Sequence, residues 1–287
     1  MPVPGFTPDR PETDKRKPAN VAHPQHWARA AYGYFWLALG YAYFGVLGLL
    51  VTLAAAILYP VLPRQVGSRL ARNTIAGLFR GFLGILQASE IIRLELSALD
   101  ALREEHGLII APNHPCLLDA VLVISRVPDV ACITKADVWH NPVLGGGARL
   151  AGYIRNDSTQ GMLRQAAAEL RAGHSLLVFP EGTRTRTPPV SAFKGGFAVV
   201  ASRVGAPVQT VFIETDSPFL RKGWPAFKLP PLPIVYRVRL GDRFNVPPDV
   251  PGFLCALEDY YRRELAPGAA DSAHAETAPE PADLIAG

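Results

Sequence analysis

Cysteine is scarce in this chain, and the three that occur are widely spaced, with no Cys-x-x-Cys pair: Cys116, Cys132 and Cys255. This pattern supplies neither a disulfide framework nor a zinc-ligand set, and it fits a reducing compartment. The sequence also lacks a Gly-x-Ser-x-Gly element that would carry a hydrolase serine. No dense basic stripe interleaved with aromatic residues is present, so we expect no nucleic-acid partner. We expect no metal site either.

Charge is missing from one long stretch, because no Asp, Glu, Lys or Arg occurs between Arg29 and Arg64. A membrane-spanning helix needs about 20 apolar residues, so the stretch predicts a membrane-anchoring helical region over residues 27–89. It is too long and too far from the N-terminus for a signal peptide, and helices of a soluble core rarely run so far without a charge. Basic residues flank both ends, so the positive-inside rule does not separate a spanning helix from a re-entrant one. Residues 65–88, which include Arg69, Arg72 and Arg80, predict an amphipathic helix on the lipid surface.

The remaining sequence divides into one catalytic domain and two terminal extensions. Residues 1–26 are rich in Pro and charge, and residues 266–287 are rich in Ala, Pro and Glu, so both are predicted to be disordered. Short apolar runs alternate with helical segments over residues 90–265, which predicts an α/β domain with a mostly parallel central sheet flanked by helices. Strands are expected at 108–111, 130–133, 175–179, 208–213 and 234–240, and a helix from Ser158 or Thr159 to Arg171.

The first candidate motif is Asn113-His114-Pro115-Cys116-Leu117-Leu118-Asp119, directly after an expected strand. Pro115 lacks an N–H and is therefore expected in the first turn of a helix, with His114 at the helix entrance. Asp119 would accept a hydrogen bond from Nδ1, and Nε2 would take a proton from an acceptor hydroxyl as a general base. A histidine that merely caps the helix is the structural alternative. Cys116 is expected to be a small buried residue and not a nucleophile.

The second motif is Phe179-Pro180-Glu181-Gly182-Thr183-Arg184, at the end of another apolar run. Gly182 would let the backbone approach a ligand, and Arg184 offers a bidentate partner for a phosphate. We expect Glu181 to accept hydrogen bonds from a hydroxylated acceptor or to orient the arginine. The alternative is a solvated surface turn.

In this order and at this separation, the two motifs resemble the glycerolipid acyltransferases typified by 1-acylglycerol-3-phosphate acyltransferase, over about residues 90–215. The resemblance implies that His114 and Asp119 are catalytic and that the acceptor is bound by further residues of the matching blocks: Lys135, Glu181, Gly182, Thr183, Arg184 and Arg155. Two departures stand out. Pro115-Cys116 replaces the usual Gln-Ser, and the second block reads Tyr153-Ile154-Arg155-Asn156 where the family has Phe-Ile-Asp-Arg. Because side chains alternate on a strand, this one-residue displacement can turn Arg155 away from the site.

The resemblance implies a membrane enzyme that moves a fatty acyl group from an acyl-CoA or acyl-ACP thioester to a hydroxyl of a lysophosphatidic acid-like acceptor, without a cofactor. Its catalytic domain would face the cytoplasm, as at a bacterial inner membrane. A net charge of +4 suits an anionic membrane surface or a phosphorylated substrate. The altered second block leaves open another acceptor or acyl chain, as in secondary lipid or pigment acylation. A non-catalytic lipid-binding membrane protein and a lipid hydrolase are the alternatives from other classes.

Overall fold

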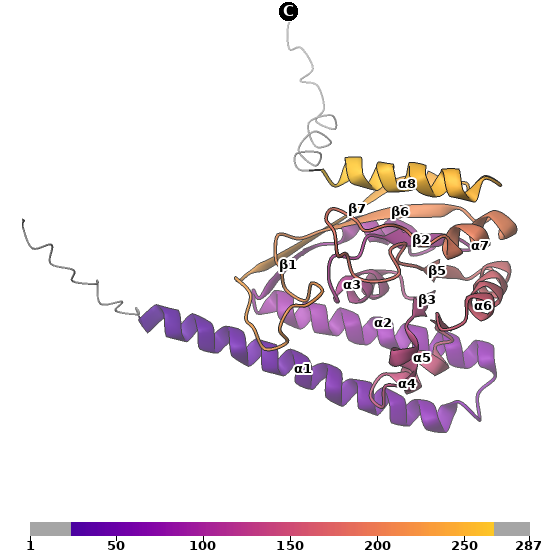
Figure 1. Cartoon of the computed structure of the whole chain (residues 1–287). Helices are drawn as coiled ribbons and strands as arrows, with labels where there is room; N and C mark the ends of the chain where they lie inside the picture. Colours follow the sequence, from indigo (N-terminus) through magenta and orange to yellow (C-terminus); the bar gives the residue numbers. More distant parts are fainter. Residues whose placement is uncertain (1–23, 267–287) are drawn as a thin grey trace, which may run out of the picture.

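The computed structural model describes residues 24–266, and these form a three-layer α/β/α domain with one long helix along one side (Figure 1). Both predicted disordered extensions lie almost wholly outside this range. Residues 24–26 of the predicted N-terminal extension are helical, because the helix α1 begins at Pro24.

The central sheet has seven strands in the order β1-β7-β6-β2-β5-β3-β4. Strands β6, β2, β5, β3 and β4 are mutually parallel, whereas β7 is antiparallel to β6 and parallel to β1. The predicted mostly parallel α/β fold is therefore confirmed. The bounds are β1 Ile92–Glu95, β2 Ile109–Pro112, β3 Val130–Thr134, β4 Ile154–Arg155, β5 Ser175–Leu177, β6 Val208–Glu214 and β7 Ile234–Phe244.

Strand β5 is shorter than expected, since it ends at Leu177 and not at Phe179. Phe179 therefore already belongs to the loop that carries the second motif, at the carboxyl end of the strand. In open α/β sheets ligands bind outside this edge.

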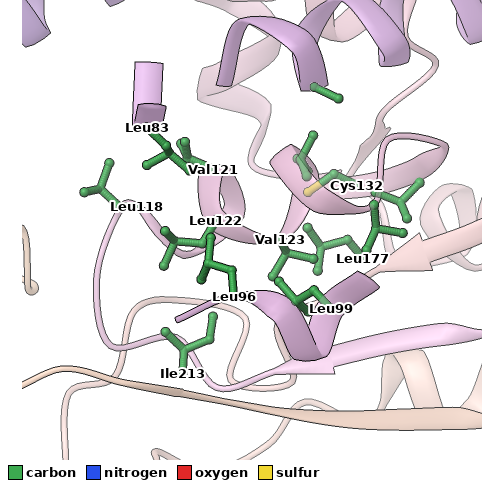
Figure 2. Close-up of a cluster of buried hydrophobic side chains, with 14 of the residues drawn as sticks. Leu83, Leu96, Leu99, Leu118, Val121, Leu122, Val123, Cys132, Leu177 and Ile213 are labelled. Atoms are coloured by element: carbon green, nitrogen blue, oxygen red, sulfur yellow. The ribbon is translucent and has the colours of Figure 1, made fainter. Parts of the chain in front are cut away.

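Two hydrophobic clusters fill the space on the two sides of the sheet, as expected where successive strand residues point to opposite faces. Ile110 and Leu177 belong to the cluster beneath α2 and α3, and Ile109 and Leu176 belong to the one beneath α6, α7 and α8. Figure 2 shows the first cluster, with Leu122 near its centre. The remaining helices are α2 Arg64–Ala88, η1 Ser97–Leu102, α3 Asp119–Arg126, α4 Ala136–His140, α5 Gly145–Leu150, α6 Thr159–Arg171, α7 Gly196–Val204 and α8 Val250–Glu264. The α6 bounds match the prediction, and the Ser158 hydroxyl accepts a hydrogen bond from the Gly161 N–H to cap this helix.

The helix α1 runs from Pro24 to Leu58 and is the one helix among residues 24–266 that is long and apolar enough to cross a membrane. One of its faces packs on the domain. The Thr52 hydroxyl donates a hydrogen bond to the Val143 carbonyl (2.6 Å), and a Cβ added to Gly146 of α5 would lie 2.7 Å from Thr52 Cα. Glycine at this position is therefore what allows α1 to approach α5 so closely.

One face of the helix α2 packs into the domain core, which corrects the prediction of a surface position for Arg72, whereas Arg69 and Arg80 are exposed. Arg72 is 1% exposed, and its guanidinium donates to the Ala151 carbonyl and forms ion pairs with Asp129 (3.3 Å) and Glu169 (2.9 Å). A charge buried at this depth requires such partners. The predicted helix is confirmed as α2, but Arg72 lies on its buried face.

Candidate active site

The first motif forms a turn between β2 and α3. Helix α3 begins at Asp119, four residues later than the expected position at Pro115, so His114 lies in the turn and outside any regular helix. The Asn113 side chain fixes the start of this turn, because its amide donates to the Ile213 carbonyl and its oxygen accepts from the Ile213 N–H. The chain then folds back, so that His114 Nδ1 lies 2.7 Å from Asp119 Oδ2.

Asp119 is fully buried, and its carboxylate receives three hydrogen bonds. In addition to the imidazole, the Cys116 N–H donates to Oδ2 (2.8 Å) and the Cys116 thiol donates to Oδ1 (3.0 Å). Burial, and then the charge of Asp119, raise the pKa of the Cys116 thiol well above its usual value, which keeps it protonated and able to donate. The Tyr236 hydroxyl, from β7, lies 3.6 Å from the same sulfur. Cys116 is thus a buried donor to the carboxylate, whereas a nucleophilic thiol would need a lowered pKa.

The second motif is in direct contact with the first through Glu181. Its Oε1 accepts hydrogen bonds from the His114 N–H (3.0 Å) and the Thr185 hydroxyl (2.7 Å), and its Oε2 accepts one from the Ser191 N–H (2.8 Å). Glu181 is 1% exposed. The expectation that this carboxylate meets an acceptor hydroxyl or orients Arg184 is therefore corrected, because it instead joins the two motif loops.

The imidazole is held between the two motifs with a small part of its surface open. Phe179 stacks on the ring at 3.8 Å between centroids and 18° between planes, and the Thr185 N–H donates to the His114 carbonyl. His114 remains 15% exposed. With Nδ1 on Asp119, Nε2 is the nitrogen left to meet a substrate.

A group of cations lies near this site at the same edge of the sheet. Arg184 donates through Nη1 to the Leu220 carbonyl (2.8 Å), and Lys135 follows β3 directly. Loss of hydration, and then the positive charges of Arg186, Lys135 and Arg184, lower the pKa of Lys222. The motifs predicted Lys135 and Arg184 but missed Arg186 and Lys222. Lys222 comes from the loop between β6 and β7, to which no sequence signal tied the site.

The remaining predicted site residues, Gly182, Thr183 and Arg155, have no recorded hydrogen bond to the His114–Asp119 pair. Gly182 and Thr183 lie in the motif turn, where Gly182 has a φ of +66°, a conformation that favours glycine. Arg155 on the edge strand β4 pairs with Asp157 at 2.5 Å, and its guanidinium lies over the Trp139 ring at 5.4 Å. Within residues 24–266, no group of three His, Cys, Asp or Glu side chains is placed to hold a metal ion.

An apolar cavity of about 90 Å³ lies between α1, α2 and the loop that precedes β7, and it reaches the first motif at Leu118 and the start of that loop at Leu220. The Leu220 carbonyl accepts hydrogen bonds from both Arg184 and the Leu117 N–H. The cavity thus adjoins both motifs, although no sequence pattern predicted it.

Residues 93–214 match the family model described as Acyltransferase. Both motifs fall within these bounds, and residues 93–214 are similar to this family and to the named acyltransferases below, which confirms the resemblance drawn from the motifs.

Similar proteins include a 1-acyl-sn-glycerol-3-phosphate acyltransferase of Limnanthes douglasii, 31% identical over 133 residues that cover 44% of this chain and 46% of that protein. A lyso-ornithine lipid O-acyltransferase of Pseudomonas aeruginosa is 33% identical over 122 residues, covering 41% of this chain and 45% of the relative. The chain therefore spans less than half the length of these curated relatives. The crystal structure of the 1-acyl-sn-glycerophosphate acyltransferase PlsC from Thermotoga maritima has the same fold, with a TM-score of 0.62 and 19% identity, over 83% of this chain and 95% of that one.

Proposed function

We propose that this protein is a membrane-associated O-acyltransferase that transfers a fatty acyl group from a thioester of coenzyme A or acyl carrier protein to a hydroxyl of a lysophosphatidic acid-like acceptor. The observation that carries the proposal is the His114–Asp119 pair, locked by Glu181 against the turn that presents Arg184. The names of the similar proteins support the reaction class.

His114 acts as the general base in this proposal. Nε2 takes the proton of the acceptor hydroxyl while the hydroxyl oxygen attacks the thioester carbonyl, and Asp119 stabilises the imidazolium. The tetrahedral intermediate then collapses, the carbon–sulfur bond breaks, and the thiolate leaves with the proton from His114. No acyl-enzyme, metal or other cofactor enters the sequence of steps.

The cation group selects the acceptor by charge. Arg184 can hold a phosphate in a bidentate manner, and Lys135, Arg186 and Lys222 add positive charge around it. A phosphate monoester carries about two negative charges at neutral pH, so it matches this cluster better than a zwitterionic headgroup does. The apolar cavity at Leu118 and Leu220 supports a lipid chain beside the same site.

A second candidate keeps the chemistry and changes the acceptor to a lyso-ornithine lipid. The similarity to the Pseudomonas aeruginosa protein and the displaced Arg155, which is engaged by Asp157, favour it. Bilayer association through α1, with the catalytic domain on the cytoplasmic side, is part of both candidates.

The test is an acyl-transfer assay with purified protein, acyl-CoA and acyl-ACP donors, and both acceptors offered in parallel. We expect product from lysophosphatidic acid, and a loss of about 10²- to 10⁴-fold in kcat for His114→Ala. His140→Ala, an exposed histidine on α4, is the matched control. Unchanged turnover by His114→Ala would remove the base from the mechanism, and exclusive use of the lyso-ornithine lipid would favour the second candidate.

A further inference from the structure

The exposed large apolar side chains of residues 24–266 gather on one side of the molecule. Sixteen of the nineteen lie on α1, on α2 or in the turn between them. The other three belong to the catalytic domain: Leu117, Leu144 and Phe227. Within the described residues, none lies on α6, α7 or α8, which cover the opposite face of the sheet (Figure 1). The three exceptions therefore deserve a common explanation.

All three border α1 or the loop between β6 and β7, residues 215–233, called here the 215–233 loop. A Cβ on Gly48 of α1 would lie 3.1 Å from a methyl carbon of Leu144, and the Leu117 N–H donates to the carbonyl of Leu220 in the loop. Phe227 belongs to the loop itself. It is 79% exposed, the largest exposed fraction among these nineteen side chains.

The 215–233 loop contacts α1 at Ala226 and Phe227. The Tyr41 hydroxyl donates to the Ala226 carbonyl, and the Tyr41 and Phe227 rings meet edge to face at 5.8 Å. Tyr41 is itself 40% exposed. The open surface of Phe227 is therefore continuous with the uncharged face of α1, the helix that is long and apolar enough to cross a membrane.

The charges of the loop are suited to a headgroup layer. Lys222 and Lys228 are both exposed, and the Lys228 ammonium lies 4.9 Å from the centroid of the Trp224 ring. Aromatic rings with neighbouring lysines are typical of the membrane interface, where the rings sit at headgroup level and the ammonium groups remain in water or on phosphates.

We propose that the 215–233 loop is a second bilayer contact, in which Phe227 enters the lipid beside α1 while Lys222 and Lys228 stay at the headgroups. Arg184 donates to the carbonyls of Leu220 and Arg221, which fixes the start of the loop to the phosphate-binding turn. The loop thus holds that turn at the height of the headgroups, where a lipid acceptor presents its phosphate. This consequence for acceptor access depends on the proposed function, whereas the contact itself does not.

A depth measurement with a polarity-sensitive thiol label tests the contact without any assay of activity. Phe227→Cys is made in a Cys255→Ser background, because the remaining cysteines, Cys116 and Cys132, are buried and Phe227 is exposed. The wild-type protein labelled at Cys255 is the matched control, since this residue is exposed on α8, across the sheet from α1. Circular dichroism verifies that both proteins are folded.

With vesicles of phosphatidylcholine and phosphatidylglycerol, we expect a blue-shifted emission at position 227 that is quenched by lipids brominated in the acyl chain. Position 255 should show neither change. An emission at 227 that is insensitive to vesicles, or an equal response at both positions, would overturn the proposal.

A kinetic comparison tests the consequence for acceptor access. Phe227→Ser should raise KM for an acceptor embedded in vesicles by about tenfold, a change equivalent to about 1.4 kcal/mol, and leave KM for a monomeric short-chain acceptor unchanged. An equal rise for both acceptors would contradict a bilayer role for Phe227. If neither acceptor were turned over by the wild type, the proposed function would fail while the labelling result still stood.

Discussion

The Cys116 sulfur lies 3.0 Å from Asp119 Oδ1, the carboxylate oxygen opposite the one that meets His114. Each oxygen of the buried carboxylate is therefore held by its own donors, and rotation about the Cβ–Cγ bond would break bonds on both sides. A carboxylate fixed in this way presents a constant direction to the imidazole, which is what an orienting group in a general-base pair must do. Cys116 stands at the motif position where the resembled family usually has serine.

Replacement of the thiol tests this positioning role. Cys116→Val removes the donor and adds one heavy atom to the side chain, and a hydrogen bond to a charged acceptor contributes about 1.5–3 kcal/mol. We expect kcat to fall by about tenfold or more, with KM little changed, whereas Cys116→Ser should restore kcat because it keeps a donor. Cys255→Val is the exposed control. Steady-state kinetics with full activity in Cys116→Val would show that the sulfur only fills space.

Asp119→Asn keeps the shape of the carboxylate but removes its charge. We expect kcat to fall by about 10²- to 10⁴-fold, because the imidazolium formed during proton transfer loses its counter-charge. The measurement is a pH–rate profile beside a thermal melt, since the same change disturbs the hydrogen bonds from Cys116. Asp137→Asn, an exposed aspartate in α4, is the control. A folded Asp119→Asn protein with wild-type kcat would contradict the role of the pair.

Glu181→Gln separates a structural carboxylate from a substrate contact. The amide would turn an N–H₂ group toward the donors on one side, so we expect the free energy of unfolding to fall by about 1–3 kcal/mol. KM should change less than in Arg184→Lys, which retains charge but loses the bidentate geometry. Thermal melts and KM values of the two variants decide this point. A large rise in KM without loss of stability in Glu181→Gln would return this residue to the acceptor site.

Lys222→Ala tests the extra positive charge around Arg184. We expect KM for a phosphate-bearing acceptor to rise by about two- to tenfold at low salt, and the difference from wild type to shrink at high salt because exposed charges are screened. Arg171→Ala, an exposed arginine at the end of α6, should have no such effect. A KM that does not depend on Lys222 at any ionic strength would remove this residue from the site.

The buried Cys132 predicts a loss of stability in alkali. Burial raises the pKa of its thiol from 9.0 to about 12, so above pH 9 the unfolded chain releases a proton that the folded chain retains. This favours unfolding. The contribution of Cys132 to the free energy of unfolding is therefore fully present below pH 9, and it falls by about 1.4 kcal/mol per pH unit between pH 9 and pH 12. We expect the decline in unfolding free energy between pH 8 and pH 10 to be smaller in Cys132→Val than in Cys255→Val. Equal declines in denaturant titrations would contradict the shift.

Much of the fold and of the site could be predicted because the relevant signals are local. The apolar runs predicted five of the seven strands described, all but β1 and β4, and the spacing of His114 and Asp119 beside Pro115 predicted a histidine outside the helix. The structure brings the pair together within a turn of only six residues, which sequence spacing describes well.

The remaining features depend on contacts between distant segments. Arg72 looked like a surface residue of an amphipathic helix because its partners, Asp129 and Glu169, are supplied by other parts of the chain. Glu181 looked like a ligand residue because a strand end is usually exposed, but it accepts hydrogen bonds from His114 of the first motif turn and from Thr185 of its own loop. Lys222 joins the cation group from the loop between β6 and β7, and no sequence periodicity predicts the course of that loop.

The close approach of α1 to α5 has a mechanical consequence. A helix that meets glycine backbone at Gly146 and donates a hydrogen bond from Thr52 to Val143 cannot tilt or slide without moving the catalytic domain with it. In the membrane-bound state proposed above, the helix therefore holds the catalytic domain in a fixed position relative to the bilayer and is not a flexible tether. The distance between His114 and the lipid phosphates is then set by the packing of α1 on the domain. Lipids that change the depth or tilt of α1 in the bilayer would therefore change turnover without any contact with the imidazole.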